Sequence, residues 1–185
     1  MKHGPGGART VQKLSAWQRI VVAIEPTTSE STESGIIIAA LGRDEQGYVL
    51  ADHSGYYTME RWRELAISLF ERYRADCIVA GSTDSGRLVR SWLAMKDPQL
   101  PLRLQRRGSG SDLAVELVAN LYRQSRVHHI GAFATLEDQM VTCTGRLAHS
   151  AQTLPGRLAA LVWALSELII RHQPQRATSI RLSRG

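Results

Sequence analysis

Unbroken runs of apolar residues, separated by short polar turns, dominate the first third of the chain. Residues 19–25 read RIVVAIE and residues 35–42 read GIIIAALG, and neither run alternates between apolar and polar positions. Continuous apolar character of this kind is typical of strands covered on both faces. A polar turn at 42–47 leads into a third segment at 48–53, so the second and third segments form a predicted hairpin. The pattern predicts three consecutive strands, with the first in the middle of the sheet.

Beyond residue 58 the apolar spacing changes to the period of amphipathic helices. Thr58 is a suitable N-cap for a helix over 59–73, whose apolar residues fall on one stripe. Further strands are expected at 76–80 and 100–105, a short extended piece at 127–130, and helices at 86–95, 111–124 with Ser111 as its cap, 136–142 and 155–172. This order predicts an α/β domain with a central mixed five-stranded sheet, three antiparallel strands followed by parallel ones, flanked by helices.

The length and composition fit one globular domain. The chain has 185 residues, 43% of them hydrophobic and 22% charged, which is enough for one sizeable core. We divide it into a flexible arm at 1–18, a folded domain at 19–172 and a basic tail at 173–185. No apolar run reaches the ~18 residues of a membrane span, and no signal peptide is evident. Cys77 and Cys143 lie far apart in the sequence, which favours free thiols and a cytoplasmic setting.

The charge balance points weakly to nucleic acid. The formal net charge is +6 and most of the basic residues are arginines, which prefer bidentate contacts with phosphate. Arg103, Arg106 and Arg107 end the fifth expected strand, and Arg87 opens the helix before it. These four arginines are the candidate nucleic-acid-binding residues. For the three at the strand end, a charged edge that protects the sheet is an equally good interpretation, and arginine-rich composition by itself also raises the net charge.

Several motifs, taken together in order and spacing, resemble one nuclease family. They are IVVAIEP at 20–26, SGIIIAA at 34–40, YVLADHSG at 48–55, CIVAGSTDSG at 77–86, QSRVHHIGAF at 124–133, LEDQM at 136–140 and LPGRLAALVWAL at 154–165. Over residues 19–171 they resemble the nuclease domain of the large terminase subunit of tailed phages. The resemblance implies an RNase H-like fold. It also implies an acid at the end of the first strand, a second at the end of the fourth and a third at the start of the last helix.

The three places implied by the resemblance hold Glu25, Gly81 and Ala159, so two of the three acids are absent. The family cuts phosphodiesters with two Mg²⁺ or Mn²⁺ ions, which need several carboxylate oxygens. Glu25 remains as the candidate catalytic residue and metal ligand. Because an unpaired acid at a buried strand end is costly, Glu25 needs a metal ion or an arginine partner.

Other residues could in principle compensate for the missing acids. Asp84 is a second candidate catalytic acid, or else a helix N-terminal acid favoured by the helix dipole. His128 and His129 are adjacent in an expected strand, so their side chains point to opposite faces and do not form a metal pair. A structural role is the better interpretation for both histidines.

The sequence leaves three functions open. The first is a terminase nuclease-like domain of a phage or prophage packaging system, a pseudoenzyme with impaired or lost cleavage that still binds double-stranded DNA or packaging components such as the portal or small terminase subunit. The second is an active two-metal endonuclease that cuts concatemeric viral DNA. The third is a non-catalytic interaction protein. A phosphate-binding loop is absent, since Arg87-Leu88 stands where such a loop needs Lys and Ser or Thr, so no ATP is expected. The expected location is the cytoplasm of a bacterial host.

Overall fold

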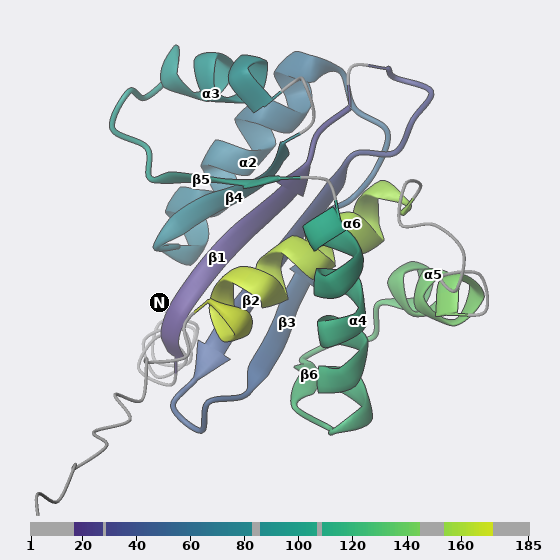
Figure 1. The fold of residues 1–185 in the computed structure, drawn as a ribbon. Coiled ribbons are helices and arrows are strands. Elements are labelled where there is room, and N and C mark those ends of the chain that lie inside the picture. The colour runs from purple at the N-terminus through teal and green to yellow at the C-terminus, as the bar shows by residue number, and fades with distance from the viewer. Residues whose placement is uncertain (1–16, 28, 83–85, 107–108, 145–153, 172–185) are drawn as a thin grey trace, which may run out of the picture.

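The computed structural model describes residues 17–27, 29–82, 86–106, 109–144 and 154–171 (Figure 1). Its centre is a mixed sheet with the strand order β5-β4-β1-β2-β3-β6. The strands are β1 (Trp17–Glu25), β2 (Gly35–Gly42), β3 (Gly47–Asp52), β4 (Cys77–Ser82), β5 (Leu102–Arg106) and β6 (Val127–His129). The first three strands are antiparallel in sequence order, while β4 runs parallel to both β1 and β5. The expected α/β architecture is confirmed.

The sheet has six strands rather than the five expected. The additional strand, β6, pairs in parallel with β3 at the edge of the sheet. It is only three residues long, which is too short for the alternation of apolar and polar residues to distinguish a strand from a loop. Its place in the sheet depends on pairing with a strand about eighty residues earlier, for example Gly47 with Val127, so the sequence could not supply it.

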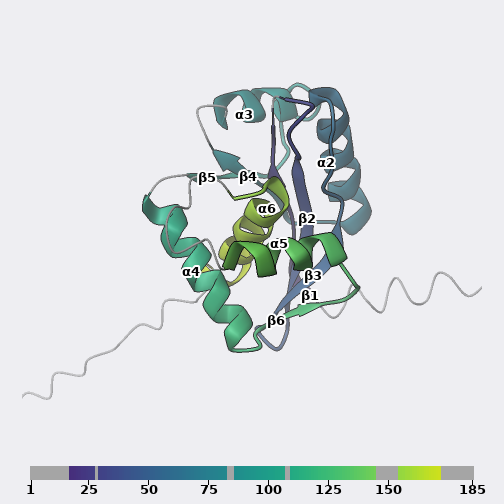
Figure 2. The ribbon, with the colours of Figure 1, turned by 90° about the vertical axis from the view of Figure 1, so that its right-hand side faces the viewer.

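Helices cover both faces of the sheet (Figures 1 and 2). The helices are α2 (Met59–Tyr73), α3 (Gly86–Ala94), α4 (Ser109–Arg123), α5 (Ala134–Thr144) and α6 (Gly156–Leu165), and α6 continues into a π-helical turn, η2 (Ser166–Ile170). One face carries α2 and α3, and the other carries α6, with α4 and α5 packed outside it. In consequence α6 is buried on all sides, which explains its almost wholly apolar sequence.

The capping residues predicted from the sequence are correct for one helix and wrong for another. Thr58 caps α2 as expected, since its hydroxyl oxygen accepts a hydrogen bond from the backbone N–H of Arg61 at 3.2 Å. The expectation for Ser111 is wrong, because α4 already begins at Ser109. Two serines stand close together in this Gly-Ser segment, and capping preference does not choose between them.

Strand β1 lies at the centre of the core. Its residues from Ile20 onward are buried, and alternate side chains contribute to two apolar clusters, one on each face of the sheet. The unbroken apolar run of β1 therefore corresponds to a strand that is buried on both faces of the sheet, as expected. Within the described residues no helix is both long enough and apolar enough to cross a membrane. The arm and tail expected at the two ends lie, apart from Trp17 and Gln18, outside the described residues.

Candidate functional site

A buried acid ends the first strand, at the place where the sequence analysis expects a catalytic residue. Glu25 is the last residue of β1 and is 7% exposed. It pairs with Gly35 of β2, while on the other side of β1 Ile24 pairs with Ala80 of β4. The next residue of β4 is Gly81. Glu25 and Gly81 therefore lie beside each other where two parallel strands end.

A tryptophan holds the carboxylate of Glu25. The indole Nε1–H of Trp163 in α6 donates a hydrogen bond to Oε2 of Glu25, with a distance of 2.6 Å between the two atoms. Side chains of a helix lean toward its N-terminus, so the indole covers the preceding turn, which contains Ala159. A metal ion or an arginine was the expected partner of Glu25. The structure places a neutral indole N–H beside it, which makes a charge-assisted hydrogen bond to the carboxylate.

Gly81 has no room for a side chain in this arrangement. A Cβ atom at position 81 would overlap Oε2 of Glu25 and would lie 2.9 Å from Nε1 of Trp163. The carboxylate of Glu25 thus occupies the volume that an acid at position 81 would need. A side chain at position 81 would therefore require the carboxylate of Glu25 to move.

The start of α6 is equally closed to acidic side chains. Ala159 is buried in the cluster between α6 and the sheet. Gly156, three residues earlier, packs against the first residue of β2, and a Cβ there would overlap the backbone oxygen of Glu33 and lie 3.0 Å from the backbone nitrogen of Gly35. Close backbone approach explains glycine at position 156.

An arginine next to these residues is paired with two acids. Arg157 lies 2.9 Å from Oε1 of Glu33 and 2.7 Å from Oδ2 of Asp52, and all three side chains are largely buried. Glu33 also accepts a hydrogen bond from Gln139 of α5 at 3.1 Å. This network joins the β1–β2 loop, the end of β3, α5 and α6. Both carboxylates face the same guanidinium group, which offsets one of their two negative charges.

The two neighbouring histidines contact different partners. His128 shares a 2.8 Å hydrogen bond with Gln46, whereas His129 bonds to the hydroxyl of Tyr122 at 2.8 Å and to Glu137 at 3.0 Å. Burial raises the pKa of the Tyr122 phenol. The hydrogen bond with His129 lowers the pKa of Glu137. The two imidazoles do not converge on one point, and His129 ties the edge strand β6 to α4 and α5.

The structure describes some of the candidate residues predicted from the sequence in full, some by their backbone alone and some not at all. Arg103 in β5 is exposed and lies 3.4 Å from Oε1 of Glu167. Arg87 is the second residue of α3 and Arg106 the last of β5, but only their backbones are described. Asp84 and Arg107 lie outside the described residues. Burial raises the pKa of the Cys77 thiol, so this cysteine is not an activated nucleophile.

Comparison with solved structures finds proteins with a similar fold. A crystal structure of the large terminase nuclease from thermophilic phage G20c, with bound zinc, is similar at a TM-score of 0.61 and 15% identity, over 80% of this chain and 81% of that one. The chain has the RNase H-like fold. At this identity the similarity shows the fold alone.

Two Holliday junction resolvases are similar at lower scores. They are RuvC of T. thermophilus in complex with its junction substrate (TM-score 0.45, 14% identity, over 82% of this chain and 95% of that one) and the yeast mitochondrial resolvase Ydc2 (TM-score 0.49, 10% identity, over 90% and 85%). No protein-family model and no curated protein matches the sequence.

The described residues at these strand and helix ends do not by themselves supply the ligands of a two-metal centre. Among the described residues, no group of three or more His, Cys, Asp or Glu side chains is placed to hold a metal ion. At the strand and helix ends named by the resemblance, Glu25 supplies one carboxylate, and that carboxylate already accepts a hydrogen bond from Trp163. Two hard cations need several such oxygens to offset their charge.

Proposed function

We propose that this chain is a terminase nuclease-like domain in which two-metal DNA cleavage is impaired or lost and DNA or packaging-complex binding is retained. One observation carries the loss of cleavage: the carboxylate of Glu25 lies where a side chain at position 81 would have to be, and Trp163 holds it there. The fold supports the link with terminase nucleases. The motif order along the sequence supports it independently.

The chemistry explains why this packing bears on activity. Two divalent ions about 4 Å apart stabilise the attacking and leaving oxygens during phosphodiester hydrolysis, and carboxylates from neighbouring strand ends must hold both ions. With Gly81 and Ala159 at two of the three expected acid positions, one carboxylate remains to do this. We expect such a site to bind a hydrated Mg²⁺ or Mn²⁺ ion weakly at best.

The retained binding follows from charge. The net charge of +6 favours a polyanionic partner, and DNA is the polyanion on which nucleases of this fold act. In a packaging system the same domain would also meet the portal or the small terminase subunit. Because the charge argument points to a polyanion, DNA is the partner that we test.

The test of lost cleavage is an assay on supercoiled and linear double-stranded DNA with Mg²⁺ or Mn²⁺, comparing the wild-type chain with Glu25→Gln. We expect both proteins to show the same background, and calorimetry to show no saturable Mn²⁺ binding by the wild type. Divalent-dependent nicking that disappears in Glu25→Gln would overturn the proposal. In that case the chain is an active endonuclease, with Asp84 as the first residue to replace.

A second measurement separates the proposal from the pure interaction protein. Fluorescence anisotropy with a labelled double-stranded oligonucleotide, in EDTA and at low salt, should show binding without sequence preference. Absence of binding under these conditions would mean that the basic composition serves no nucleic acid, and the interaction-protein function would replace the DNA-binding one.

A further inference from the structure

A second charged cluster surrounds Glu167, four residues beyond Trp163 in the turn that continues α6. The carboxylate of Glu167, in the π-helical turn η2, is only 4% exposed and is surrounded by basic and amide groups. Its Oε1 lies 2.8 Å from Nη2 of Arg19 and 3.4 Å from Nε of Arg103. Its Oε2 lies 3.9 Å from Nη1 of Arg171 and accepts a hydrogen bond from Nε2 of Gln105 at 3.4 Å. We call Arg19, Arg103 and Arg171 around Glu167 the arginine cluster.

The three arginines of the cluster are not equivalent. Arg19 makes the shortest contact with Glu167 and its side chain is 19% exposed, so it supplies the counter-charge of the buried carboxylate. Arg103 and Arg171 make longer contacts and are 61% and 54% exposed. One carboxylate cannot neutralise three guanidinium groups. Two positive charges are therefore left in excess, and they are carried by the two exposed side chains.

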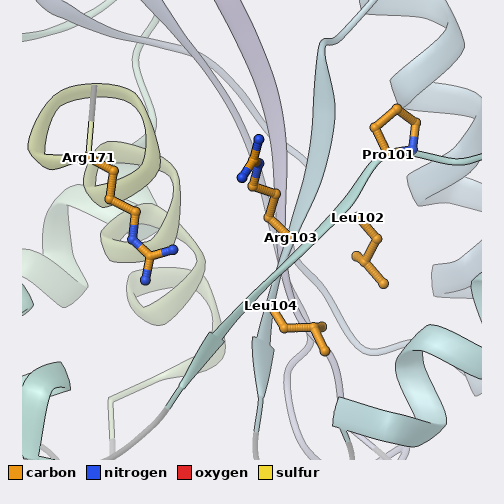
Figure 3. Close-up of a pocket in the computed structure, with 5 residues that line it drawn as sticks. All are labelled: Pro101, Leu102, Arg103, Leu104 and Arg171. Atoms are coloured by element: carbon orange, nitrogen blue, oxygen red, sulfur yellow. The ribbon is translucent and has the colours of Figure 1, made fainter. Parts of the chain in front are cut away.

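These two arginines border a hollow at the β5 edge of the sheet. It has a volume of about 320 Å³ and is lined by Pro101, Leu102, Arg103, Leu104 and Arg171. Figure 3 shows Arg103 on one side of β5 and Leu102 and Leu104 on the other, while Arg171 reaches in from the end of η2. Two cationic side chains from segments about seventy residues apart thus meet on one side of a concave, partly apolar surface.

We propose that Arg103 and Arg171 bind backbone phosphates of DNA at this hollow, while Arg19 keeps Glu167 paired. The inference rests on the proposed function, because it supplies the contact surface for the DNA that the chain is proposed to bind. A guanidinium group binds a phosphate through two parallel N–H···O bonds, a geometry that its long contacts with Glu167 do not provide. Because both guanidinium groups are more than half exposed and Glu167 keeps its shorter contact with Arg19, turning toward a phosphate costs each arginine little.

The lining also determines what kind of contact this is. The five lining residues include no aromatic ring on which a base could stack and no side-chain amide that could bond a base edge. The polar groups of the lining are two guanidinium groups, which bind phosphate oxygens and can also bond O6 and N7 of guanine. Because phosphate contacts carry no sequence information, we expect binding mainly to the DNA backbone, with little sequence preference.

The experiment compares the double variant Arg103→Ala/Arg171→Ala with the wild type in anisotropy titrations over a series of salt concentrations. Each phosphate contact contributes about 0.9 to the slope of log affinity against log salt, so the slope should fall by about two. Affinity at low salt should drop about tenfold or more. Glu167 keeps Arg19 and Gln105 as partners, so the variant should fold, which circular dichroism checks.

The matched control removes two arginines elsewhere. Arg61 and Arg72 are exposed on α2, which covers the other face of the sheet. Arg61→Ala/Arg72→Ala changes the net charge by the same amount and should leave the salt slope almost unchanged. Equal losses in the two double variants would overturn the proposal, because they would show that net charge alone determines binding. If the wild type does not bind DNA at all, it is the proposed function that fails.

A second pair of variants tests the role of Glu167 itself. Glu167→Gln removes the charge that restrains Arg103 and Arg171, whereas Glu64→Gln removes an exposed charge on α2. We expect Glu167→Gln to tighten DNA binding more than Glu64→Gln.

The last experiment measures the binding of inorganic phosphate, at matched ionic strength, and its competition with DNA. Saturable phosphate binding that does not compete with DNA would assign the hollow to a small anion and overturn the DNA assignment.

Discussion

Gly81→Ala adds one methyl group at the centre of the candidate site and tests its packing directly. The new Cβ would overlap Oε2 of Glu25 and would lie 2.9 Å from both the carboxyl carbon of Glu25 and Nε1 of Trp163. Unstrained contacts between non-bonded heavy atoms need about 3.5 Å. The carboxylate must therefore move, and the 2.6 Å hydrogen bond from Trp163 must lengthen or break.

The expected loss of stability follows from two opposing effects. A buried hydrogen bond to a charged group contributes about 1.5–3 kcal/mol. Replacing glycine by alanine within a strand returns about 0.5–1 kcal/mol through reduced backbone entropy. The free energy of unfolding should therefore fall by about 1–2 kcal/mol. For a chain of this length that corresponds to a decrease in Tm of about 3–6 °C.

The assay is equilibrium urea unfolding followed by far-ultraviolet circular dichroism, which does not depend on tryptophan fluorescence. Gly131→Ala is the matched control, because a Cβ at position 131 meets its nearest atom, in Phe133, at an ordinary 3.5 Å. Trp163→Phe removes the indole donor and completes a double-mutant cycle with Gly81→Ala. The two changes should couple by about 1–2 kcal/mol, because either one removes the same hydrogen bond.

Two outcomes would refute this reasoning. If Gly81→Ala is as stable as the wild type or more stable, the carboxylate of Glu25 is not held against position 81. If Gly81→Ala costs the same in the wild-type and Trp163→Phe backgrounds, the hydrogen bond is not what the methyl group disturbs. In the first case position 81 could accept an acid, and the structural argument for lost cleavage would fail. In the second case position 81 stays closed, but the role given to the hydrogen bond from Trp163 would fail.

Two further predictions concern the networks around the site. Arg157→Met should destabilise the fold by about 3 kcal/mol, measured by urea unfolding, because it leaves Glu33 and Asp52 largely buried without their cation; a loss below about 1 kcal/mol would contradict the network. The hydrogen bond with His129 lowers the pKa of Glu137 below its ordinary value of 4.5. The ionised carboxylate therefore stabilises the fold at pH values above 4.5, and this contribution is lost as the pH falls through the pKa of Glu137 in the folded state. Glu137→Gln should flatten the acid side of the stability curve, and an unchanged curve would show that the interaction does not form.

The pattern of the sequence determines much of the architecture, because it reports burial and local capping. Continuous apolar runs identified β1 and β2 as strands covered on both faces, and Thr58 identified the start of α2. Glu25 was recognised as a buried acid at a strand end because one carboxylate follows an unbroken apolar run. These features depend on neighbours within a few positions of the chain, and such neighbours can be read directly.

The partners of the charged residues were decided by the tertiary structure alone. Trp163 lies 138 positions from Glu25 and was predicted only as part of an apolar helix. The pairing of Glu167 with Arg19 spans 148 positions, and nothing in either local pattern indicates it. Whether position 81 can hold a side chain depends on where Glu25 and Trp163 lie, and these two residues belong to β1 and α6. Periodicity shows which face a residue occupies, but which atoms meet there depends on strand register and helix packing, and these form only when the whole chain folds.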